Sequence, residues 1–437
     1  MTPTDLEFGT DTENLLLNNM RRTLSLGCAL MLSALSFAGL PKQSDVLSAM
    51  HLANDYFMQK YSDPGKPTFV KKERPSNLWT RGVYFEGLCE LINIDGQARD
   101  LDYLTRWANA HKFTPRNGVT TRDADDYCCS QAYLFLYEHT FQNTGKRAPE
   151  MLLPTRQCMD NLLNPVPVAK TSKWTANSME DWTWIDAIQM GLPVLTRLTR
   201  ILYFEGEKDC ERYAEQGWKM YEWTRNQLAG GLFNELEGLW WRDKDFVPPY
   251  KEPNGMNCYW SRGNGWVYAA LVRAMDNAMV ARHSGPANLE PKGEYKWVVQ
   301  DYETHFDDYQ RDFCKMSYAL ARCMRKDGFW NVSLHDESNY GGKELTGTAL
   351  FVYGMAWGVR HGILPKKMFL PIVSRSWKRM VKYCLHDNGF LGYVQGTGKE
   401  PKDSQPVGYD VEPDFDDYGL GCFLLAGAEV YRLGEKQ

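Results

Sequence analysis

Apolar residues recur along the chain at intervals of three and four, which places them on one face of a helix. This pattern covers about twelve stretches, whereas the apolar–polar alternation typical of strands is scarce. The sequence therefore predicts an all-α protein. The predicted helices cover residues 44–60, 80–94, 99–112, 127–142, 147–162, 184–202, 208–227, 264–281, 297–325, 346–362, 366–385 and 418–433.

Short and long connections alternate between these helices, which indicates a closed ring of six helical hairpins. The long loops would then wall a cleft at one end of the ring. A stack of helical repeats is the alternative all-α arrangement, but the sequence has no fixed period. No low-complexity linker divides the chain, so we expect residues 40–437 to form one domain. The long connections are 113–126, 163–183, 228–263, 327–346 and 386–417.

The N-terminal part carries the pattern of an export signal. Two arginines after Met20 precede an apolar run at 24–37 that ends in small residues. This run is too short to span a bilayer stably, so the sequence predicts a signal peptide at 20–39 rather than a membrane span. The acidic and polar residues 1–19 are interpreted as an over-long start. An amphipathic first helix is the alternative. We expect export, to a bacterial periplasm.

The composition is acidic overall and rich in aromatic residues. The formal net charge is −5, so no basic patch points to nucleic acid. The 15 Trp and 24 Tyr suit the binding of sugar rings, although large helical cores would also use them. The cysteines and the eight histidines are dispersed along the chain, without metal-ligand spacing. We therefore expect neither a metal nor a cofactor.

Two clusters of carboxylates stand in the long loops, each just before a predicted helix. The first contains Asp123, Asp125 and Asp126, and helix capping accounts for only one of the three. The second ends in Asp186, which follows two tryptophans. A carboxylate against indole rings should have a raised pKa, as a general acid at neutral pH requires. An N-terminal cap is the alternative role for Asp186.

A third group of unusual residues runs from Ser261 to Trp266 at the start of a predicted helix. Arg262 stands there between tryptophans and beside two glycines, which allow close approach of the backbone. A guanidinium fork beside aromatic faces suits a carboxylate on a flat, hydroxylated ring. The alternative is that Arg262 and Trp266 only pack at the helix start.

These motifs, in this order and spacing, resemble glycoside hydrolase family 105, the unsaturated rhamnogalacturonyl hydrolases, which are related to the unsaturated glucuronyl hydrolases of family 88. The resemblance extends from about residue 45 to the end of the chain. Each motif alone is weak, but the ordered set is specific. The matching segments are Asp125 to Glu138, Trp184-Ile185-Asp186, Trp260 to Trp266, Asp327-Gly328-Phe329-Trp330, Glu344 to Phe351 and Tyr418 to Ala426.

The resemblance implies an (α/α)6 barrel that acts on oligosaccharides left by polysaccharide lyases. Such oligosaccharides end in a uronic acid with a C4=C5 double bond, which the family hydrates before the glycosidic bond breaks. By position, Asp186 would be the acid and base, and Asp125 the partner carboxylate. Arg262 and Trp266 would hold the unsaturated ring, with Trp184 beside it.

Two positions depart from the family pattern. Trp240 or a neighbour stands where rhamnogalacturonan-cleaving members carry a histidine, and Trp79 replaces a tyrosine. Both positions would face the substrate, as would Asp126. The sequence therefore predicts an unsaturated glucuronyl or galacturonyl end on a glycan other than rhamnogalacturonan.

Other classes of protein remain open at this point. A conventional inverting glycosidase would use Asp125 and Asp186 as base and acid across a water molecule. A sugar epimerase would need histidines as a paired acid and base, and the cleft loops contain few. A glycan-binding protein would keep the tryptophans without needing a desolvated Asp186.

Overall fold

The computed structural model describes residues 39–165, 174–283 and 295–435, and Leu40–Gln437 is one compact unit. Residues 1–38, which hold nearly all of the expected signal peptide, lie outside the described residues. Twelve long helices make up most of the described part. They are α2 (Gln43–Lys60), α3 (Trp79–Asp95), α4 (Ala98–Ala110), α6 (Ser130–Thr144), α7 (Pro149–Leu163), α8 (Asp186–Phe204), α9 (Glu211–Asn226), α10 (Ser261–Ala278), α11 (Phe306–Cys323), α12 (Leu345–Arg360), α13 (Lys366–Tyr383) and α14 (Asp417–Leu433).

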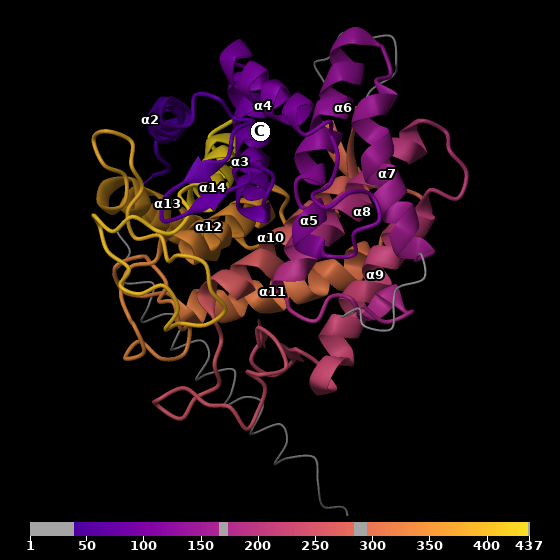
Figure 1. Cartoon of the computed structure of the whole chain (residues 1–437). Coiled ribbons are helices and arrows are strands. Elements are labelled where there is room, and N and C mark those ends of the chain that lie inside the picture. Colours follow the sequence, from indigo (N-terminus) through magenta and orange to yellow (C-terminus); the bar gives the residue numbers. More distant parts are fainter. Residues whose placement is uncertain (1–38, 166–173, 284–294, 436–437) are drawn as a thin grey trace, which may run out of the picture. The chain divides into compact units, whose positions relative to one another are not determined.

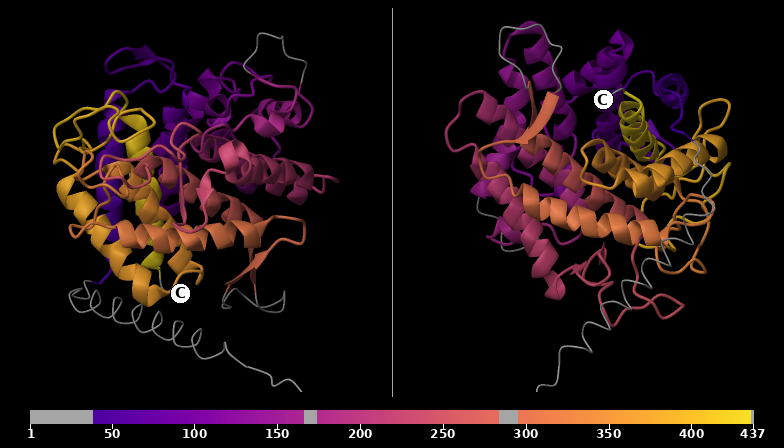
Figure 2. Two further views of the ribbon diagram at one scale, coloured as in Figure 1. Left: turned by 90° about the horizontal axis from the view of Figure 1, so that it is seen from below. Right: turned by 180° about the vertical axis from the view of Figure 1, so that it is seen from behind.

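Alternate helices close into an inner ring. Each of α3, α6, α8, α10 and α12 contacts the next, and α14 contacts both α12 and α3, which completes the circle (Figure 1). The outer helices α2, α4, α7, α9, α11 and α13 pack on this ring. Figure 2 shows from two further sides that yellow α14 lies next to indigo α3. The expected ring of six helical hairpins is therefore confirmed.

The burial of the helices explains which of them line the ring. Helix α12 is buried at every residue from Leu345 to Val359, and α14 at every residue from Asp417 to Val430. Outer helices such as α4 and α11 bury one face only. A helix that is apolar on all sides is stable only when other elements surround it, which is the position of α12 and α14.

Glycines let two inner helices come close together. A Cβ atom placed on Gly87 of α3 would lie 2.5 Å from the carbonyl oxygen of Gly421 of α14. A Cβ atom on Gly421 would overlap the carbonyl oxygen of Val83 in the same way. The chain therefore needs glycine at both positions, because a side chain would push the two backbones apart.

The largest difference from the expected elements lies in 297–325, where one long helix was expected. Helix α11 begins only at Phe306, and Tyr295–Val299 forms strand β6, which pairs antiparallel with β5 (Met279–His283). The apolar run in β6 fits a strand as well as a helix, and its pairing partner is the preceding strand, β5. The preceding helix, α10, accordingly ends at Ala278.

Short elements complete the fold. Strands β1 (Thr68–Phe69) and β2 (Glu73–Arg74) form one ribbon, and β3 (Phe233–Asn234) and β4 (Leu239–Trp240) form another. The 3-10 turns are η1 (Ser178–Glu180) and η2 (Leu228–Gly230), and α5 (Ala124–Tyr127) is a single helical turn. In the part of the chain with described coordinates, no helix has the length and apolarity that a membrane crossing requires.

The first residues of the inner helices meet at one end of the ring. Trp79, at the start of α3, contacts Trp266 of α10 and Tyr418 of α14. A Cβ atom on Gly263 of α10 would touch Ile185, just before α8. The long loops enter the inner helices at this end, which therefore holds the motifs that the sequence singled out.

Candidate active site

The first carboxylate cluster forms a tight helical turn. Asp123 is the N-cap of α5, and its side chain accepts a hydrogen bond from the backbone N–H of Asp125 (N···Oδ1 3.3 Å). Capping thus accounts for one acid, as expected. The side chain of Asp125 is half-buried and is not the cap of α5, so capping does not explain this acid.

Asp126 is occupied within its own loop. Its carboxylate accepts hydrogen bonds from Arg116 Nη1 (3.2 Å), Asn117 Nδ2 (3.0 Å) and Thr121 Oγ1 (2.6 Å), and only 4 % of the residue is exposed. These contacts fix the loop that precedes α5. Asp126 therefore positions its loop, and because it also lines the cavity beside this turn its predicted contact with substrate stays a prediction.

The second carboxylate lies at the first residue of α8. Asp186 is 8 % exposed, and Arg242 Nε donates to its Oδ2 atom over 3.0 Å. A short backbone pairing brings the two residues together, because Trp184 bridges to Asp243 and the Ile185 N–H donates to the Arg242 carbonyl (3.0 Å). Sequence reasoning missed Arg242. Its only signal was its place two residues after Trp240 in the family motif.

Trp182 connects the two carboxylate segments. Its indole Nε1 donates to the hydroxyl of Tyr127 at the end of α5 (2.9 Å). A Cβ atom on Gly191 of α8 would lie 2.5 Å from the same indole ring. Trp182 is fully buried, so it packs between the segments of Asp125 and Asp186 and fixes how they lie.

A raised pKa is found at Asp125, the first of the two carboxylates. Burial, together with the charges of Asp123, Asp186 and Asp126 and against the opposing charge of Arg242, raises the pKa of Asp125 to about 7. Asp186, which was expected to be the proton donor, forms an ion pair with Arg242. The structure thus provides one carboxyl that holds a proton near neutral pH and one that is ion-paired.

Arg262 does not offer its fork to the cleft. The side chain is 1 % exposed, and Nη1 and Nη2 donate to the backbone carbonyls of Gln395 (2.6 Å) and Gly396 (2.8 Å). The guanidinium also lies over the rings of Trp260 and Tyr418, 4.6 and 5.1 Å from their centroids. Arg262 therefore holds the 395–396 loop, and its expected contact with a uronate carboxylate stays a prediction.

The four expected tryptophans fall into two groups. Trp240 is fully buried against Tyr221 and Phe233, so it belongs to the core and does not face substrate as expected. Trp266 is also fully buried. Trp79 and Trp184 are half-buried at the starts of α3 and α8, where each keeps part of its ring open.

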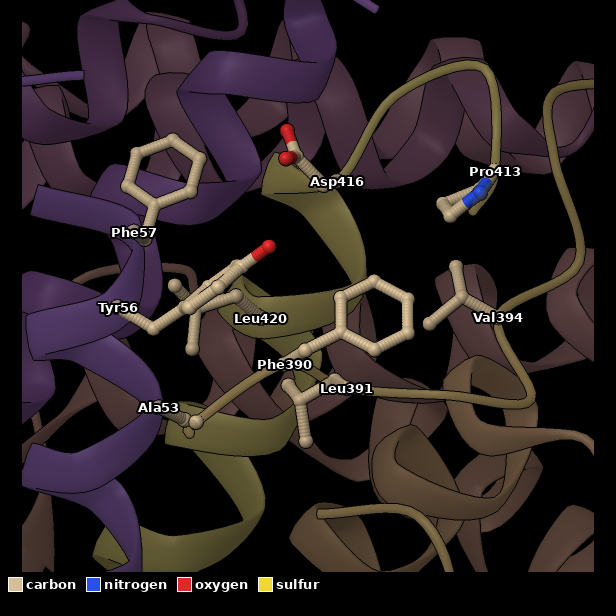
Figure 3. Close-up of a pocket in the computed structure, with 10 residues that line it drawn as sticks. Ala53, Tyr56, Phe57, Phe390, Leu391, Val394, Pro413, Asp416 and Leu420 are labelled. Carbon is tan, nitrogen blue, oxygen red and sulfur yellow. The ribbon is translucent and has the colours of Figure 1, made fainter. Parts of the chain in front are cut away.

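Two cavities differ in what they can hold. A cavity of about 310 Å³ lies beside the Asp125 turn. An apolar cavity between α2 and the start of α14 measures about 20 Å³, which is room for about one water molecule and excludes a sugar (Figure 3). The larger cavity is lined by Asn117, Thr120, Thr121, Asp123, Asp126 and Trp174. Within the described ranges, no three His, Cys, Asp or Glu side chains are grouped to hold a metal ion.

A ring of six helical hairpins, with Asp125 in the turn α5 and Asp186 at the first residue of α8, has the arrangement of a helical-barrel enzyme with paired carboxylates. The family follows from comparison with known proteins. The model described as Glycosyl Hydrolase Family 88 matches residues 49–434, and the chain belongs to this family.

Two curated relatives are similar over most of their length. An unsaturated 3S-rhamnoglycuronyl hydrolase of Formosa agariphila is 29 % identical over 365 residues, which cover 82 % of this chain and 85 % of the relative. A protein of the same name from an Alteromonas species is 28 % identical over 372 residues, which cover 82 % of this chain and 78 % of the relative.

Solved structures share the fold. A family 88 glycosyl hydrolase from Bacteroides vulgatus has a TM-score of 0.70 and 24 % identity, with 90 % of this chain and 100 % of that chain covered. A possible family 105 member from Salmonella enterica has a TM-score of 0.63 and 17 % identity, covering 90 % and 96 %. A mutant unsaturated glucuronyl hydrolase from Streptococcus agalactiae, in complex with dGlcA-GalNAc6S, has a TM-score of 0.55 and 13 % identity, covering 91 % and 93 %.

Proposed function

We propose that this enzyme removes a terminal 4,5-unsaturated uronic acid from oligosaccharides left by polysaccharide lyases. The observation that carries the proposal is the pair of unequal carboxylates at the mouth of the barrel. Asp125 can hold a proton near neutral pH, and Asp186 is paired with Arg242. Membership of family 88 and the names of the two curated relatives support the same substrate class.

Hydration of the double bond uses one proton donor and one proton acceptor. A carboxylic acid gives its proton to C4, and a water molecule adds to C5 while a carboxylate takes a proton from it. The resulting hemiketal at C5 opens, and the glycosidic bond then breaks without attack at C1. The net change at the double bond is the addition of H to C4 and OH to C5.

We further propose that the sugar next to the uronate is rhamnose and that the enzyme is of the family 105 type. The curated relatives are named for rhamnoglycuronyl substrates, and the family 105 motifs recur in order along the chain. Trp79, a half-buried ring where the rhamnogalacturonan-cleaving pattern has tyrosine, favours a parent glycan other than rhamnogalacturonan.

A panel of lyase-generated oligosaccharides tests both proposals. The purified enzyme is incubated with unsaturated uronyl–rhamnose with and without sulfate, and with unsaturated uronyl–N-acetylhexosamine. Release of the second sugar is measured by chromatography. The matched control substrate carries a saturated uronate.

Release from the unsaturated uronyl–rhamnose substrates, and none from the saturated control, is expected. Exclusive release from the N-acetylhexosamine substrate would overturn the rhamnose proposal while keeping the reaction class. Equal release from the saturated control would instead favour a conventional inverting glycosidase.

A further inference from the structure

We propose that the far half of the barrel, away from the candidate active site, holds a binding site for a small anion that carries a phosphate, sulfate or carboxylate group. A cavity of about 350 Å³ lies there, which is within the size range of small-ligand pockets. No step of the proposed reaction uses this far cavity, so the inference stands apart from the proposed function. Its lining includes five arginines, namely Arg197, Arg200, Arg273, Arg360 and Arg432.

The far cavity lies on the axis of the helical ring. Residues from all six inner helices line it, among them Arg197 of α8 and Arg432 of α14, two helices that stand opposite each other in the ring. Arg197 follows Asp186 by eleven positions in α8, which is about 16 Å along the helix. Arg273 follows Arg262 by the same number of positions in α10. Because the inner helices begin at the active-site end, these arginines lie well away from it.

Two arginines on the α8 wall share one carboxylate. Arg197 Nε donates to Glu138 Oε2 (2.6 Å), and Arg200 donates to Glu138 Oε1 through Nε (3.1 Å) and Nη2 (2.6 Å). Among the described residues, neither Nη atom of Arg197 has an acceptor, nor has Nη1 of Arg200. Each guanidinium carries five N–H donors, which is more than half of one carboxylate can satisfy. Glu138 therefore holds both arginines in place and leaves donors for a ligand.

The opposite wall repeats this arrangement around Glu429. Arg360 Nε and Arg432 Nη1 both donate to this carboxylate (2.9 and 2.7 Å), and Arg432 Nη2 donates to Glu90 (2.6 Å). The side chains of the five arginines are only 11–21 % exposed. A guanidinium held this way is already oriented, so a ligand does not have to immobilise a flexible side chain.

Arg273 closes the inner end of the cavity. Its Nη1 atom donates to Gln131 Oε1 (2.9 Å), and its Nη2 atom lies 3.5 Å from Glu86 Oε2. Within the described part of the chain, Nε and Nη2 of Arg273 make no hydrogen bond although both atoms are buried. This cation therefore adds positive charge to the inner end of the cavity.

Three acids also line the cavity and decide where an anion can lie. Glu90 accepts from Arg432, and Asp276 accepts from Trp357 Nε1 (3.0 Å), so each of these two has its own donor. Glu435 is exposed near the end of the described chain. An anion should avoid these carboxylates and bind on the α8 wall, where guanidinium forks match its oxygen atoms.

Isothermal titration calorimetry tests the inference without any substrate. The full chain is titrated with sodium phosphate, sodium sulfate and sodium glucuronate, in a buffer free of these anions and at an ionic strength held constant with sodium chloride. We expect saturable binding of at least one of the three. The absence of saturable binding for all three would overturn the inference.

Two variants then locate the bound anion. Arg197→Gln removes the charge and the unpaired Nη groups from the α8 wall, and Arg432→Gln removes a guanidinium from the opposite wall. Each should weaken binding by about tenfold or more, the scale of one charge-assisted hydrogen bond. The matched control is Arg156→Gln, which removes a guanidinium bound to Glu207 (Nη1···Oε2 2.8 Å) outside the cavity. Its dissociation constant should stay within about twofold of the unaltered value.

Circular dichroism checks that each variant is folded, and either cavity variant alone is sufficient for the test. Binding that the folded cavity variants leave unchanged would place the anion elsewhere and overturn the inference. So would a loss in Arg156→Gln as large as that in the cavity variants, because it would indicate unspecific attraction to cations. Binding of phosphate or sulfate alone would support a site for an inorganic oxyanion, and binding of glucuronate would support a site for a sugar acid.

Discussion

Replacing Arg262 with methionine should destabilise the protein strongly. The variant keeps most of the apolar stem but removes two hydrogen bonds from a guanidinium to buried backbone carbonyls, at 2.6 and 2.8 Å. It also removes the cation from above the rings of Trp260 and Tyr418.

The size of the expected change in unfolding free energy follows from the hydrogen bond that each backbone carbonyl loses. A hydrogen bond from a charged donor contributes about 1.5–3 kcal/mol. The Gln395 carbonyl keeps the Tyr418 hydroxyl as a donor, whereas no second donor to the Gly396 carbonyl is found among the described residues. Removal of a buried charge offsets part of the loss. We therefore expect Arg262→Met to lower the free energy of unfolding by about 3 kcal/mol.

Urea unfolding followed by circular dichroism measures this change, with Arg106→Met on the surface of α4 as the control. The control should change the free energy of unfolding by less than about 0.5 kcal/mol. A loss below about 1 kcal/mol for Arg262→Met would refute the conclusion that Arg262 holds the 395–396 loop.

The kinetics of Arg262→Lys distinguish two roles for Arg262. One is to hold the 395–396 loop, and the other is to bind the uronate carboxylate, as the sequence suggested. At a temperature where this variant is fully folded, its KM should stay within about threefold of the unaltered value, since the guanidinium does not face the cleft. A tenfold rise in KM, which is worth about 1.4 kcal/mol of binding, would return Arg262 to the substrate.

Two further predictions concern stability and export. Because the pKa of Asp125 is raised from 3.8 to about 7, the stability that its protonated form contributes is full below about pH 4 and is lost as pH rises through 7. Asp125→Asn should therefore gain stability relative to the unaltered protein between pH 5 and pH 8 in urea unfolding, and an equal difference at both values would contradict the raised pKa. We also propose export to a periplasm, so N-terminal sequencing of protein from the native host should find a first residue near Leu40, and recovery of residues 24–37 in the mature protein would contradict cleavage.

Most of the fold could be predicted because helical periodicity is a local property of the sequence. The alternation of short and long loops then indicated the ring. The exception, Tyr295–Val299, is a short apolar run whose pairing with Met279–His283 could not be read from either segment alone.

The site could be predicted only in part, since local context does not reveal distant partners. Asp125 and Asp186 stood out beside their helices. Arg242 meets Asp186 across 56 positions, and Arg262 meets Gln395 across 133, so both contacts exist only in the folded chain. These distant contacts pair Asp186 with a cation and bind Arg262 to a backbone loop, which neither local sequence indicated. Trp240 shows the same limit, because its burial depends on β3 and α9.

The ultraviolet absorbance of the unsaturated uronate, followed together with release of the second sugar, tests the central claim most directly. Hydration of C4=C5 removes the chromophore, so absorbance should fall by one equivalent for each equivalent of sugar released. Asp125→Asn and Asp186→Asn should slow both signals together, because one reaction produces both. Release of sugar while the absorbance persists would contradict hydration and show that the bond breaks by direct attack at C1.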